Sequence, residues 1–480
     1  MDPIVVFYII DVLLALVLIF LERRRPENVL FWLAVLFFLP EIGFFIYLIF
    51  GRRPYRWNKI ALRAEERDQE YLKHLSGMEG FDDSIPHTAG ARGAMGEHRQ
   101  TVSFLEVSGS SLTKENSVHI ITEGAEKYDL LFEDIRKAKH HVHLEYFVFR
   151  NDDIGKELLS LLVSKADEGV RVRLLIDDVG GRPSEIALLE LKSKGGEYAR
   201  FYPSYVPFLR WLNVNINYRN HRKIAVVDGR IAYTGGFNIG DEYVGKDPKL
   251  GHWRDTHIRV EGPAVRSLQL RFLIDWDYAS GEEMDDFAKY FPVAYNKGET
   301  TIQVVSSGPT ERAEQVKEAY LKLTASAKKS IFIQTPYFVP DQSIMDTLRI
   351  ASRSGVDVRI MVPRRKDQLL VHWVSQSFIG ELLEAGVRAF YYDDGFLHSK
   401  TITVDGIVTS IGSANWDIRA FALNFETNAI ILDGGVAREH ERIFYKDMES
   451  CSELTKELYD RRGLAERIKE SISRLVAPVL

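Results

Sequence analysis

Two long apolar stretches begin the pattern of apolar and polar positions along this chain. Residues 4–21 are apolar except for one aspartate, and residues 29–50 are apolar except for Pro40 and Glu41. Each stretch is long enough for a helix across a bilayer, which takes about 20 residues. No positively charged segment precedes the first stretch and no small-residue cleavage site follows it, so a cleaved signal peptide fits poorly. We therefore predict a transmembrane helix hairpin in residues 1–57, kinked or re-entrant at Pro40.

The following segment, residues 58–101, is polar. It begins with a charged helical pattern and continues as a glycine-containing linker with few apolar residues. A segment of this composition cannot bury enough apolar surface to form its own core. We predict a solvated spacer between the hairpin and the remainder of the chain.

Beyond this spacer the pattern alternates between helical and strand periods. Residues 127–178 read as helix, strand, helix, strand, and residues 312–363 repeat that order. Such alternation is typical of a layered α/β domain. The same order occurring twice indicates that a whole domain is duplicated.

Shorter phrases support the duplication. EYF at 145–147 parallels PYF at 336–338, and a Gly-Val pair precedes the next strand in both segments. We predict an α/β fold with two duplicated mixed-sheet halves packed about a pseudo-two-fold axis, with a boundary near Gly298. The halves span residues 102–298 and 299–480, the second ending in a helical segment.

The helical segment at the end carries a regular apolar stripe. Leu464, Ile468, Ile472 and Leu475 recur at helical spacing among charged residues. Such a stripe usually contacts a core, which is the expectation here, while the ending LVAPVL also suits a membrane surface.

The strongest repeat surrounds two Asp-Gly pairs. Apolar alternation leads into Asp-Gly and out again at 224–233 and at 401–410, which predicts two tight hairpins. Polar residues around both turns keep one spacing, because each lies 177 positions before its counterpart in the second copy. The pairs are His221 and His398, Lys223 and Lys400, Asp228 and Asp405, Gly235 and Gly412, and Asn238 and Asn415. A repeat that conserves polar positions while apolar ones drift predicts two half-sites that meet.

The histidine and lysine of each copy stand two residues apart on the incoming strand, so they face the same side. Near neutral pH an imidazole serves as a neutral nucleophile or as a protonated acid. Two imidazoles therefore suit a double displacement, in which one attacks and the other protonates the leaving oxygen. Lysine supplies a compact positive charge for the non-bridging oxygens of a phosphodiester. We expect Asn238, Asn415 and the backbone amides at Gly236 and Ser413 to bind the same oxygens.

Carboxylates complete the candidate set. Asp255 and Glu426 each stand in a strand-like run and are the better candidates to orient the imidazoles. Asp228 and Asp405 either belong to the catalytic set or only hold the Asp-Gly turns, and the sequence leaves both interpretations open.

Two further features lie near the motifs. Arg219, Arg222 and Arg419 are candidates to bind a second anionic headgroup, although exposed arginines near a site are common. Residues 200–211 are aromatic and interrupted by proline. They form either a lip that receives acyl chains at the membrane interface or a loop packed on the core.

The paired His-x-Lys-(x)4-Asp motif is that of the phospholipase D superfamily. The phrases RNHRKIAVVDG, YTGGFNIGDEY, FLHSKTITVDG, GSANWDIRAF and LNFE resemble those of bacterial cardiolipin synthases, and the resemblance covers nearly the whole chain. It implies phosphatidyl transfer through a covalent phosphohistidine, without a metal or an organic cofactor. In that reaction we expect His221 to attack phosphatidylglycerol and His398 to protonate the departing glycerol, before a second phosphatidylglycerol completes cardiolipin.

Composition narrows the alternatives. The 480 residues are 45% hydrophobic and 27% charged, enough for two sizeable cores and an appendage. The net charge of −6 disfavours nucleic acid as a partner, and with it a nuclease of the same superfamily. The single Cys451 excludes an intrachain disulfide. No Cys/His cluster has metal-ligand spacing, and the histidines at 140–143 fit a strand better.

The sequence leaves the acceptor open. Water as the acceptor would make the chain a phospholipase D hydrolase, and serine would make it a phosphatidylserine synthase. A catalytically dead scaffold would be expected to have lost a motif residue, and none is lost. Basic residues after the second apolar stretch favour a cytoplasmic catalytic part. We therefore expect a multi-pass protein of the bacterial inner membrane, with phosphatidylglycerol and cardiolipin in the bilayer as its partners.

Overall fold

The computed structural model describes part of the chain. The described residues are 12–16, 26–39, 42–43, 46–47, 99–107, 109–202, 218–282, 287–292, 297–310 and 313–477. Most of the predicted hairpin, nearly all of the predicted spacer and most of the aromatic segment 200–211 lie outside these ranges. Within the second predicted span the structure describes helix α2 (Pro26–Phe38). None of the helices in the described ranges is both long and apolar enough to cross a bilayer.

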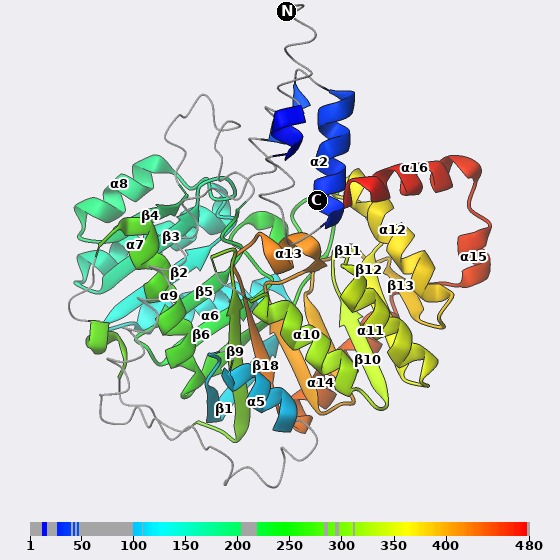
Figure 1. The fold of residues 1–480 in the computed structure, drawn as a ribbon. Helices are drawn as coiled ribbons and strands as arrows, with labels where there is room; N and C mark the ends of the chain where they lie inside the picture. Colours follow the sequence, from blue (N-terminus) through cyan, green and yellow to red (C-terminus); the bar gives the residue numbers. More distant parts are fainter. Residues whose placement is uncertain are drawn as a thin grey trace, which may run out of the picture.

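The first half follows the predicted alternation of helix and strand (Figure 1). Its elements are α5 (Arg99–Val107), β1 (Leu112–Ile121), α6 (Gly124–Lys137), β2 (His141–Tyr146), α7 (Asp153–Asp167), β3 (Arg171–Asp177), α8 (Glu185–Ser193), β4 (Glu197–Phe201), β5 (Lys223–Val227), β6 (Ile231–Gly235), η2 (Asp241–Val244), β7 (Trp253–Arg254), β8 (His257–Glu261), α9 (Ala264–Ser280) and η3 (Phe287–Tyr290).

The second half repeats this order and adds elements at its end. Its elements are β9 (Thr300–Ser307), α10 (Gln315–Ser326), β10 (Ser330–Gln334), β11 (Phe338–Val339), α11 (Gln342–Arg353), β12 (Asp357–Pro363), α12 (Leu369–Leu383), β13 (Arg388–Tyr392), β14 (Phe396–Leu397), β15 (Thr401–Val404), β16 (Val408–Gly412), β17 (Trp416–Asp417), α13 (Ile418–Ala422), β18 (Glu426–Ile431), α14 (Gly434–Met448), β19 (Cys451–Leu454), α15 (Lys456–Asp460) and α16 (Leu464–Leu475).

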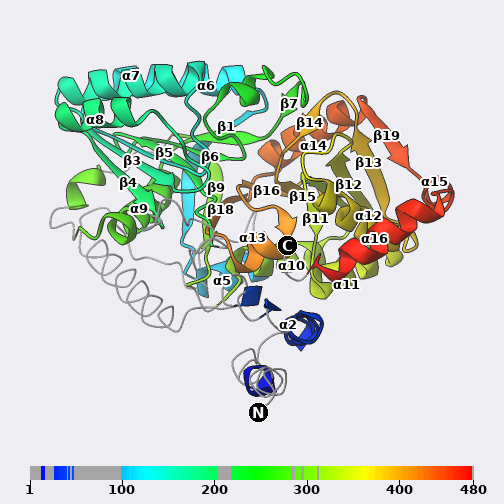
Figure 2. The same ribbon diagram turned by 90° about the horizontal axis from the view of Figure 1, so that it is seen from above.

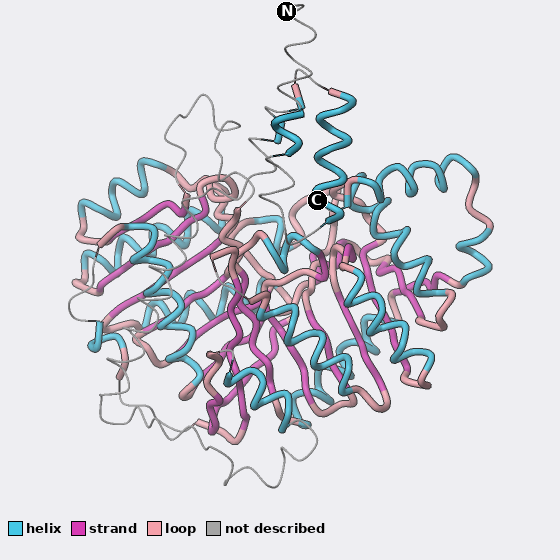
Figure 3. The backbone as a smooth tube through the Cα atoms, in the orientation of Figure 1, coloured by secondary structure: helices cyan, strands magenta, loops and turns pink. Residues whose placement is uncertain are grey.

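Fifteen strands from both halves join in one continuous sheet, which runs through the middle of the molecule (Figure 3), while β11 pairs with β17 and β7 with β14 in two small separate sheets. Antiparallel pairing of β1 with β9 connects the halves. From that centre the first half runs β1-β8-β6-β5-β2-β3-β4 and the second runs β9-β18-β16-β15-β10-β12-β13-β19, so the order is the same in both. β2, β3 and β4 are parallel, as are β10, β12 and β13. The predicted α/β fold with duplicated mixed-sheet halves is confirmed.

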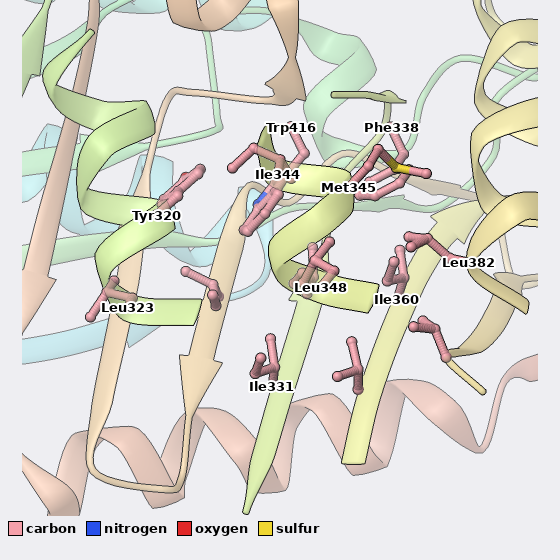
Figure 4. Packing of buried hydrophobic residues seen from close by; sticks show 14 of the residues in the cluster. Tyr320, Leu323, Ile331, Phe338, Ile344, Met345, Leu348, Ile360, Leu382 and Trp416 are labelled. Atoms are coloured by element: carbon pink, nitrogen blue, oxygen red, sulfur yellow. The ribbon is translucent and has the colours of Figure 1, made fainter. Parts of the chain in front are cut away.

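Helices cover both faces of this sheet. In the first half α6, α7 and α8 pack on one face while α9 packs on the other, as the view from above shows (Figure 2). In the second half α10, α11 and α12 pack on one face and α14 on the other. Figure 4 shows the first of these cores, where Tyr320 of α10 stacks on Trp416 with ring centroids 4.5 Å apart. One cluster includes Ile302, Ile411 and Phe425 beside residues of α9, so apolar contacts also join the two halves.

Both Asp-Gly pairs form the predicted hairpin turns. Asp228 and Gly229 have φ of 54° and 64°, and Asp405 and Gly406 have φ of 55° and 64°. Successive positive φ values match the right-handed twist of the strands that each turn joins. The turns connect β5 to β6 and β15 to β16.

The strand register corrects one detail of the predicted repeat. Glu145 pairs with Ile224, and Gln334 pairs with Thr401 at the equivalent position of the second hairpin. Glu145 therefore corresponds to Gln334, and EYF aligns with QTP two residues before PYF. The similar letters were misleading because Glu145 and Tyr146 end strand β2, whereas Pro336 comes after the end of β10.

Candidate active site

The two motif histidines lie at the junction of the halves. His221 precedes β5, and its backbone N–H donates to the carbonyl of Phe425 in the second half at 3.0 Å. His398 precedes β15, and its backbone N–H donates to the carbonyl of Arg254 in the first half at 2.7 Å. Each histidine is therefore positioned by the half to which it does not belong.

The carboxylates predicted to orient the rings reach across the same junction. Nδ1 of His221 lies 2.9 Å from Oε1 of Glu426, and Nδ1 of His398 lies 2.7 Å from Oδ2 of Asp255. Both carboxylates are fully buried. A carboxylate on Nδ1 favours the tautomer that carries its proton there, which leaves Nε2 of each ring for chemistry.

The rings are enclosed but reachable. The side chain of His221 is 12% exposed and that of His398 is 11% exposed. Phe147 meets the first ring edge-on at 5.0 Å, and Trp253 lies 4.9 Å from the second. Aromatic walls of this kind exclude water while leaving one edge of each imidazole open.

The motif lysines are buried beside the histidines. Nζ of Lys223 donates to the carbonyl of His221 at 2.6 Å, and Nζ of Lys400 lies 2.7 Å from Nδ1 of His398. Burial lowers the pKa of Lys223 to about 7 and that of Lys400 to about 8, because the charged form loses its hydration. An anion bound between them would restore the charged form.

Each motif influences the charge state of the other. Burial lowers the pKa of His221, which Glu426 opposes, and burial followed by Lys400 lowers the pKa of His398 to about 3. Each ring also feels the lysine of the other half, because Lys400 lowers the pKa of His221 and Lys223 lowers that of His398. In the free protein both imidazoles are therefore neutral near pH 7.

The small residues after the hairpins have a different role from the expected one. The amide of Gly236 donates to Thr256 at 2.9 Å, and that of Ser413 donates to Thr427 at 3.0 Å, so neither is directed at a phosphate. A Cβ at Gly236 would lie 1.8 Å from Oδ1 of Asp255, which leaves room only for glycine. Ser413 instead hydrogen-bonds through Oγ to Glu426. Both positions support the orienting carboxylates.

The two motif asparagines are buried next to these residues. Oδ1 of Asn238 accepts from the amide of Val148 at 3.1 Å, which fixes its rotamer. Asn415 hydrogen-bonds to Asp417, whose pKa burial raises to about 6. Binding of phosphate oxygens by the two asparagines stays a prediction.

The motif aspartates lie away from the histidines. Asp228 accepts hydrogen bonds from the backbone amides of Lys139, His140 and His141, all at 2.8 to 2.9 Å. Asp405 accepts from the amides of residues 328–330 in the same way, at 2.7 to 2.9 Å. Lys223 is the first residue of β5, and Asp228 directly follows the last one, at the opposite end of the strand. The sequence left two interpretations of these aspartates open. The geometry favours the one in which they hold the turns.

The three candidate arginines are largely withdrawn from solvent. Arg219 is 5% exposed, and its guanidinium pairs with Asp177 at 3.2 Å. Arg222 is fully buried and makes a bidentate pair with Asp275 at 2.6 and 2.8 Å, so it does not face a headgroup. Arg419 is half-buried, and burial lowers its pKa.

A second buried ion pair mirrors that of Arg222. Arg254 binds Asp447 of α14 through two hydrogen bonds of 2.9 and 2.7 Å and also donates to Ser399 at 3.2 Å. Ser399 stands in the second motif where the first has Arg222. The sequence signal was present, because Arg254 directly precedes Asp255, but its partner lies in the other half.

A neutral donor accompanies each of these aspartates. Nε2 of Gln334 donates to Oδ2 of Asp447 at 2.7 Å. At the equivalent position Glu145 is fully buried, accepts from Asn220 at 2.5 Å, and has its pKa raised well above the usual range by burial and then by Asp275. A protonated Glu145 would donate a hydrogen bond to Asp275, as the amide of Gln334 donates to Asp447.

Among the described residues, no group of three or more histidine, cysteine, aspartate or glutamate side chains could hold a metal ion. His141 and His143 belong to β2, as predicted, and both hydrogen-bond to Gln269 at 2.9 Å. The histidines, lysines and carboxylates of the site together suit the binding and displacement of a phosphodiester.

Comparison with known proteins agrees with this chemistry. The family described as "Cardiolipin synthase, PLD-like domain" matches residues 131–250 and 320–448, and "Phospholipase_D-nuclease N-terminal" matches residues 9–52. "Cardiolipin synthase 2" of Staphylococcus epidermidis is 43% identical, over 98% of this chain and 96% of its own. "Major cardiolipin synthase ClsA" of Bacillus subtilis is 43% identical, over 99% of this chain and 98% of its own. A phosphatidylserine synthase from Haemophilus influenzae shares the fold, with a TM-score of 0.59 at 15% identity over 76% of this chain and 95% of its own.

Proposed function

This chain belongs to the bacterial cardiolipin synthases of the phospholipase D superfamily, and we propose that its two motif histidines carry out the phosphatidyl transfer. The enzyme condenses two phosphatidylglycerol molecules to cardiolipin and glycerol. Its histidines, lysines and carboxylates divide that work between two chemical steps.

One observation carries the proposal. Asp255 of the first half binds His398 of the second at 2.7 Å, and Glu426 of the second binds His221 of the first at 2.9 Å. The reciprocal pairs hold two oriented imidazoles in one enclosed site with two buried lysines. A double displacement at phosphorus requires this arrangement, because nucleophile and acid must act on one phosphate.

In the first step Nε2 of His221 attacks the phosphorus of phosphatidylglycerol. A phosphorus–nitrogen bond forms and the bond from phosphorus to the glycerol oxygen breaks. The departing oxygen takes a proton from Nε2 of His398, and free glycerol leaves. Lys223 and Lys400 offset the charge that develops on the non-bridging oxygens.

The surroundings of the two rings favour this division of roles. Nδ1 of His221 has two acceptors, Glu426 and the carbonyl of Ser413 at 3.1 Å, which offset the positive charge of a phosphorylated ring. At His398 the ammonium of Lys400 disfavours a charged ring. A bound phosphate anion raises the pKa of His398, so the ring takes up a proton from solvent, which it then gives to the departing glycerol oxygen.

In the second step the roles of acid and base reverse. His398, now neutral, removes a proton from a glycerol hydroxyl of the second phosphatidylglycerol. That oxygen attacks phosphorus, the bond to His221 breaks, and cardiolipin forms. Asn238 and Asn415 are proposed to hold the phosphate oxygens in both steps.

The division is tested with a phosphatidyl ester of p-nitrophenol, a leaving group that departs without an acid. His398→Ala should release one equivalent of nitrophenol per enzyme and then stall, whereas His221→Ala should release none. His119→Ala is a matched control, because this histidine lies on the exposed side of β1 and pairs with Glu126. A burst from both active-site variants would refute the assignment of His221.

The acceptor is tested separately with labelled phosphatidylglycerol in bilayers. Cardiolipin with free glycerol is the expected product. Phosphatidic acid as the main product would show that water is the acceptor and that the chain acts as a phospholipase D hydrolase. Phosphatidylserine formed on addition of serine would favour the assignment as a phosphatidylserine synthase.

The protein associates with the membrane that holds its substrate. We propose that it is a multi-pass protein of the cell membrane with its catalytic part in the cytoplasm. The match of residues 9–52 to an N-terminal family segment and the basic residues after the second apolar stretch support this placement. Protease digestion of inverted membrane vesicles should cleave the catalytic halves, and protection there would contradict it.

A further inference from the structure

Helix α16 is amphipathic, but its apolar face is exposed, whereas a surface helix of a folded domain normally packs that face on the protein. Its apolar side chains face solvent: Leu464 is 74% exposed, Ile468 48%, Ile472 62% and Leu475 71%. The expectation that this stripe contacts the core is wrong. A helix that shows solvent its apolar face has another surface to cover it.

The polar side of α16 is the side that packs on the protein. Glu470 is 5% exposed and pairs with Arg462 at 2.7 Å, while Ser473 is 3% exposed. Arg474 pairs with Glu381 of α12 at 2.6 Å. The helix is therefore attached through polar contacts, which hold its apolar face outward.

Charge around the apolar stripe is complementary to an anionic surface. Residues 461–475 contain five basic and two acidic side chains, although the whole chain carries a net charge of −6. Arg467 and Lys469 lie on α16 itself. Three of the five basic groups are in ion pairs, Arg462 with Glu470, Lys469 with Glu466 and Arg474 with Glu381, so Arg461 and Arg467 carry most of the excess positive charge. An exposed apolar face bordered by basic residues is the pattern of a helix that lies in the plane of a lipid surface.

The position of α16 in the fold agrees with that partner. In Figure 1 it lies on the same upper side of the molecule as α2, whose Leu30, Phe37 and Phe38 are 67 to 76% exposed. Figure 2 looks down on this side and shows both helices near the viewer. The same side carries α13, which follows directly after Asn415 and β17. Helices α2, α13 and α16 thus lie on one side of the molecule.

We infer that α16 is an in-plane membrane-binding helix, which inserts its apolar face into an anionic bilayer. With 12 residues at about 1.5 Å per residue it spans roughly 18 Å, too short to cross a bilayer but long enough to lie in its surface. Docking of α16 beside α2 orients the opening of the site toward the headgroups. The inference rests on the proposed function only in that the substrate is a membrane lipid.

The test uses the full chain in vesicles of phosphatidylglycerol and phosphatidylcholine. Cys451→Ala removes the one cysteine, and Ile468→Cys then accepts an environment-sensitive fluorophore. Ile350→Cys on α11 is the matched control, because it is 64% exposed and lies near the far end of a helix that begins beside β11. The probe at 468 should shift to the blue and be quenched by lipids brominated on their acyl chains, while the probe at 350 should do neither.

Two outcomes would overturn the inference. An unshifted and unquenched probe at 468 would show that the helix remains in water. A blue shift without lipid quenching would show that another protein surface, such as a second copy of the chain, covers it. Quenching should be the same in a His398→Ala background, so a failure of the proposed catalysis does not affect this result.

A functional measurement complements the probe. Replacing Leu464 and Ile472 by serine should lower turnover in vesicles about tenfold, because apolar burial drives binding of such helices. Turnover of phosphatidylglycerol dispersed in detergent micelles should be unchanged. Equal turnover in vesicles by this variant and the parent protein would contradict a role for α16.

Discussion

Replacing Asp228 by alanine tests whether the third residue of the motif is structural. Its carboxylate accepts three backbone hydrogen bonds, from Lys139, His140 and His141, at the start of β2. It lies five residues beyond Lys223 along β5, which at about 3.3 Å per residue places it about 16 Å from the site. At that distance it cannot touch the phosphate.

The magnitude follows from these contacts. A hydrogen bond to a charged group contributes about 1.5–3 kcal/mol, but two of the three amides are exposed and can turn to water, so we expect a net loss of about 3–4 kcal/mol. Alanine at a φ of 54° adds about 1 kcal/mol of backbone strain. Asp228→Asn tolerates the turn and keeps one acceptor oxygen, so it should lose less than half as much.

Thermal unfolding in detergent and the rate constant kcat are measured on the same samples. For Asp228→Ala the Tm should fall by about 4–5 °C, because the expected loss is about 4–5 kcal/mol and unfolding of 480 residues carries an entropy of about 1 kcal/mol/K. At a temperature where the variant is still folded, kcat should stay within about twofold of the parent value, as expected for a residue outside the chemistry. Asp405→Ala should behave alike. A loss of kcat of a hundredfold or more, with the Tm unchanged, would refute the structural role.

The remaining predictions concern the buried charges. Burial lowers the pKa of Lys223 to about 7 and that of Lys400 to about 8, so kcat/KM should fall as the pH rises through this range and the ammonium groups are lost. Lys223→Arg should move this alkaline limb upward, because Lys400 with its pKa of about 8 then sets it, and a profile flat from pH 6 to 9 would contradict the role of the lysines. Arg254→Ala strands the buried Asp447 and should cost about 3–5 kcal/mol in unfolding free energy, while removing both side chains should cost less than the sum of the single losses. Glu145→Gln should keep both Tm and kcat, because an amide fills the same position in the other half, and a severe loss would show that the carboxyl proton itself is needed.

The duplicated halves and the meeting of the motifs could be inferred from sequence because polar residues repeat at one spacing. His221 and His398 keep their interval with no insertion, and the Asp-Gly pairs indicate their turns. Asp255 and Glu426 could be identified because each is an acid in a strand-like run of the sequence, where a carboxylate is expected to be buried.

Other features left no such signal. The partners of Asp228 are backbone amides, which any sequence provides, so its structural role could not be predicted from the residue types around it. The amide of Gly236 was assigned to a phosphate, but glycine is needed there because Asp255 occupies the space of a Cβ. For α16 the spacing of Leu464 and Ile468 defines an apolar face, yet periodicity does not state whether protein or another surface covers it.

The two halves meet one packing requirement by different means. Asp275 and Asp447 occupy equivalent places in α9 and α14, and each binds a buried guanidinium from the region of the motifs, while Asp275 also binds Arg271 of its own helix at 3.0 Å. At Asp275 it comes from Arg222 within the first motif, beneath the ring of Phe425 at 5.2 Å. At Asp447 it comes from Arg254, which stands where the other half has Phe425. Two copies of one ancestral arrangement have thus diverged in a compensating manner.

Both arginines cross the junction of the halves, and this links assembly to catalysis. Arg222 donates through Nε to the carbonyl of Glu426 at 3.2 Å, and Arg254 donates to the carbonyl of Asp255. Each guanidinium therefore holds the backbone of a carboxylate that binds a motif imidazole. Because every one of these imidazole–carboxylate contacts joins one half to the other, neither half alone can orient its own histidine. Formation of both imidazole–carboxylate pairs therefore requires docking of the halves, as the proposed shared site of the two motifs would demand.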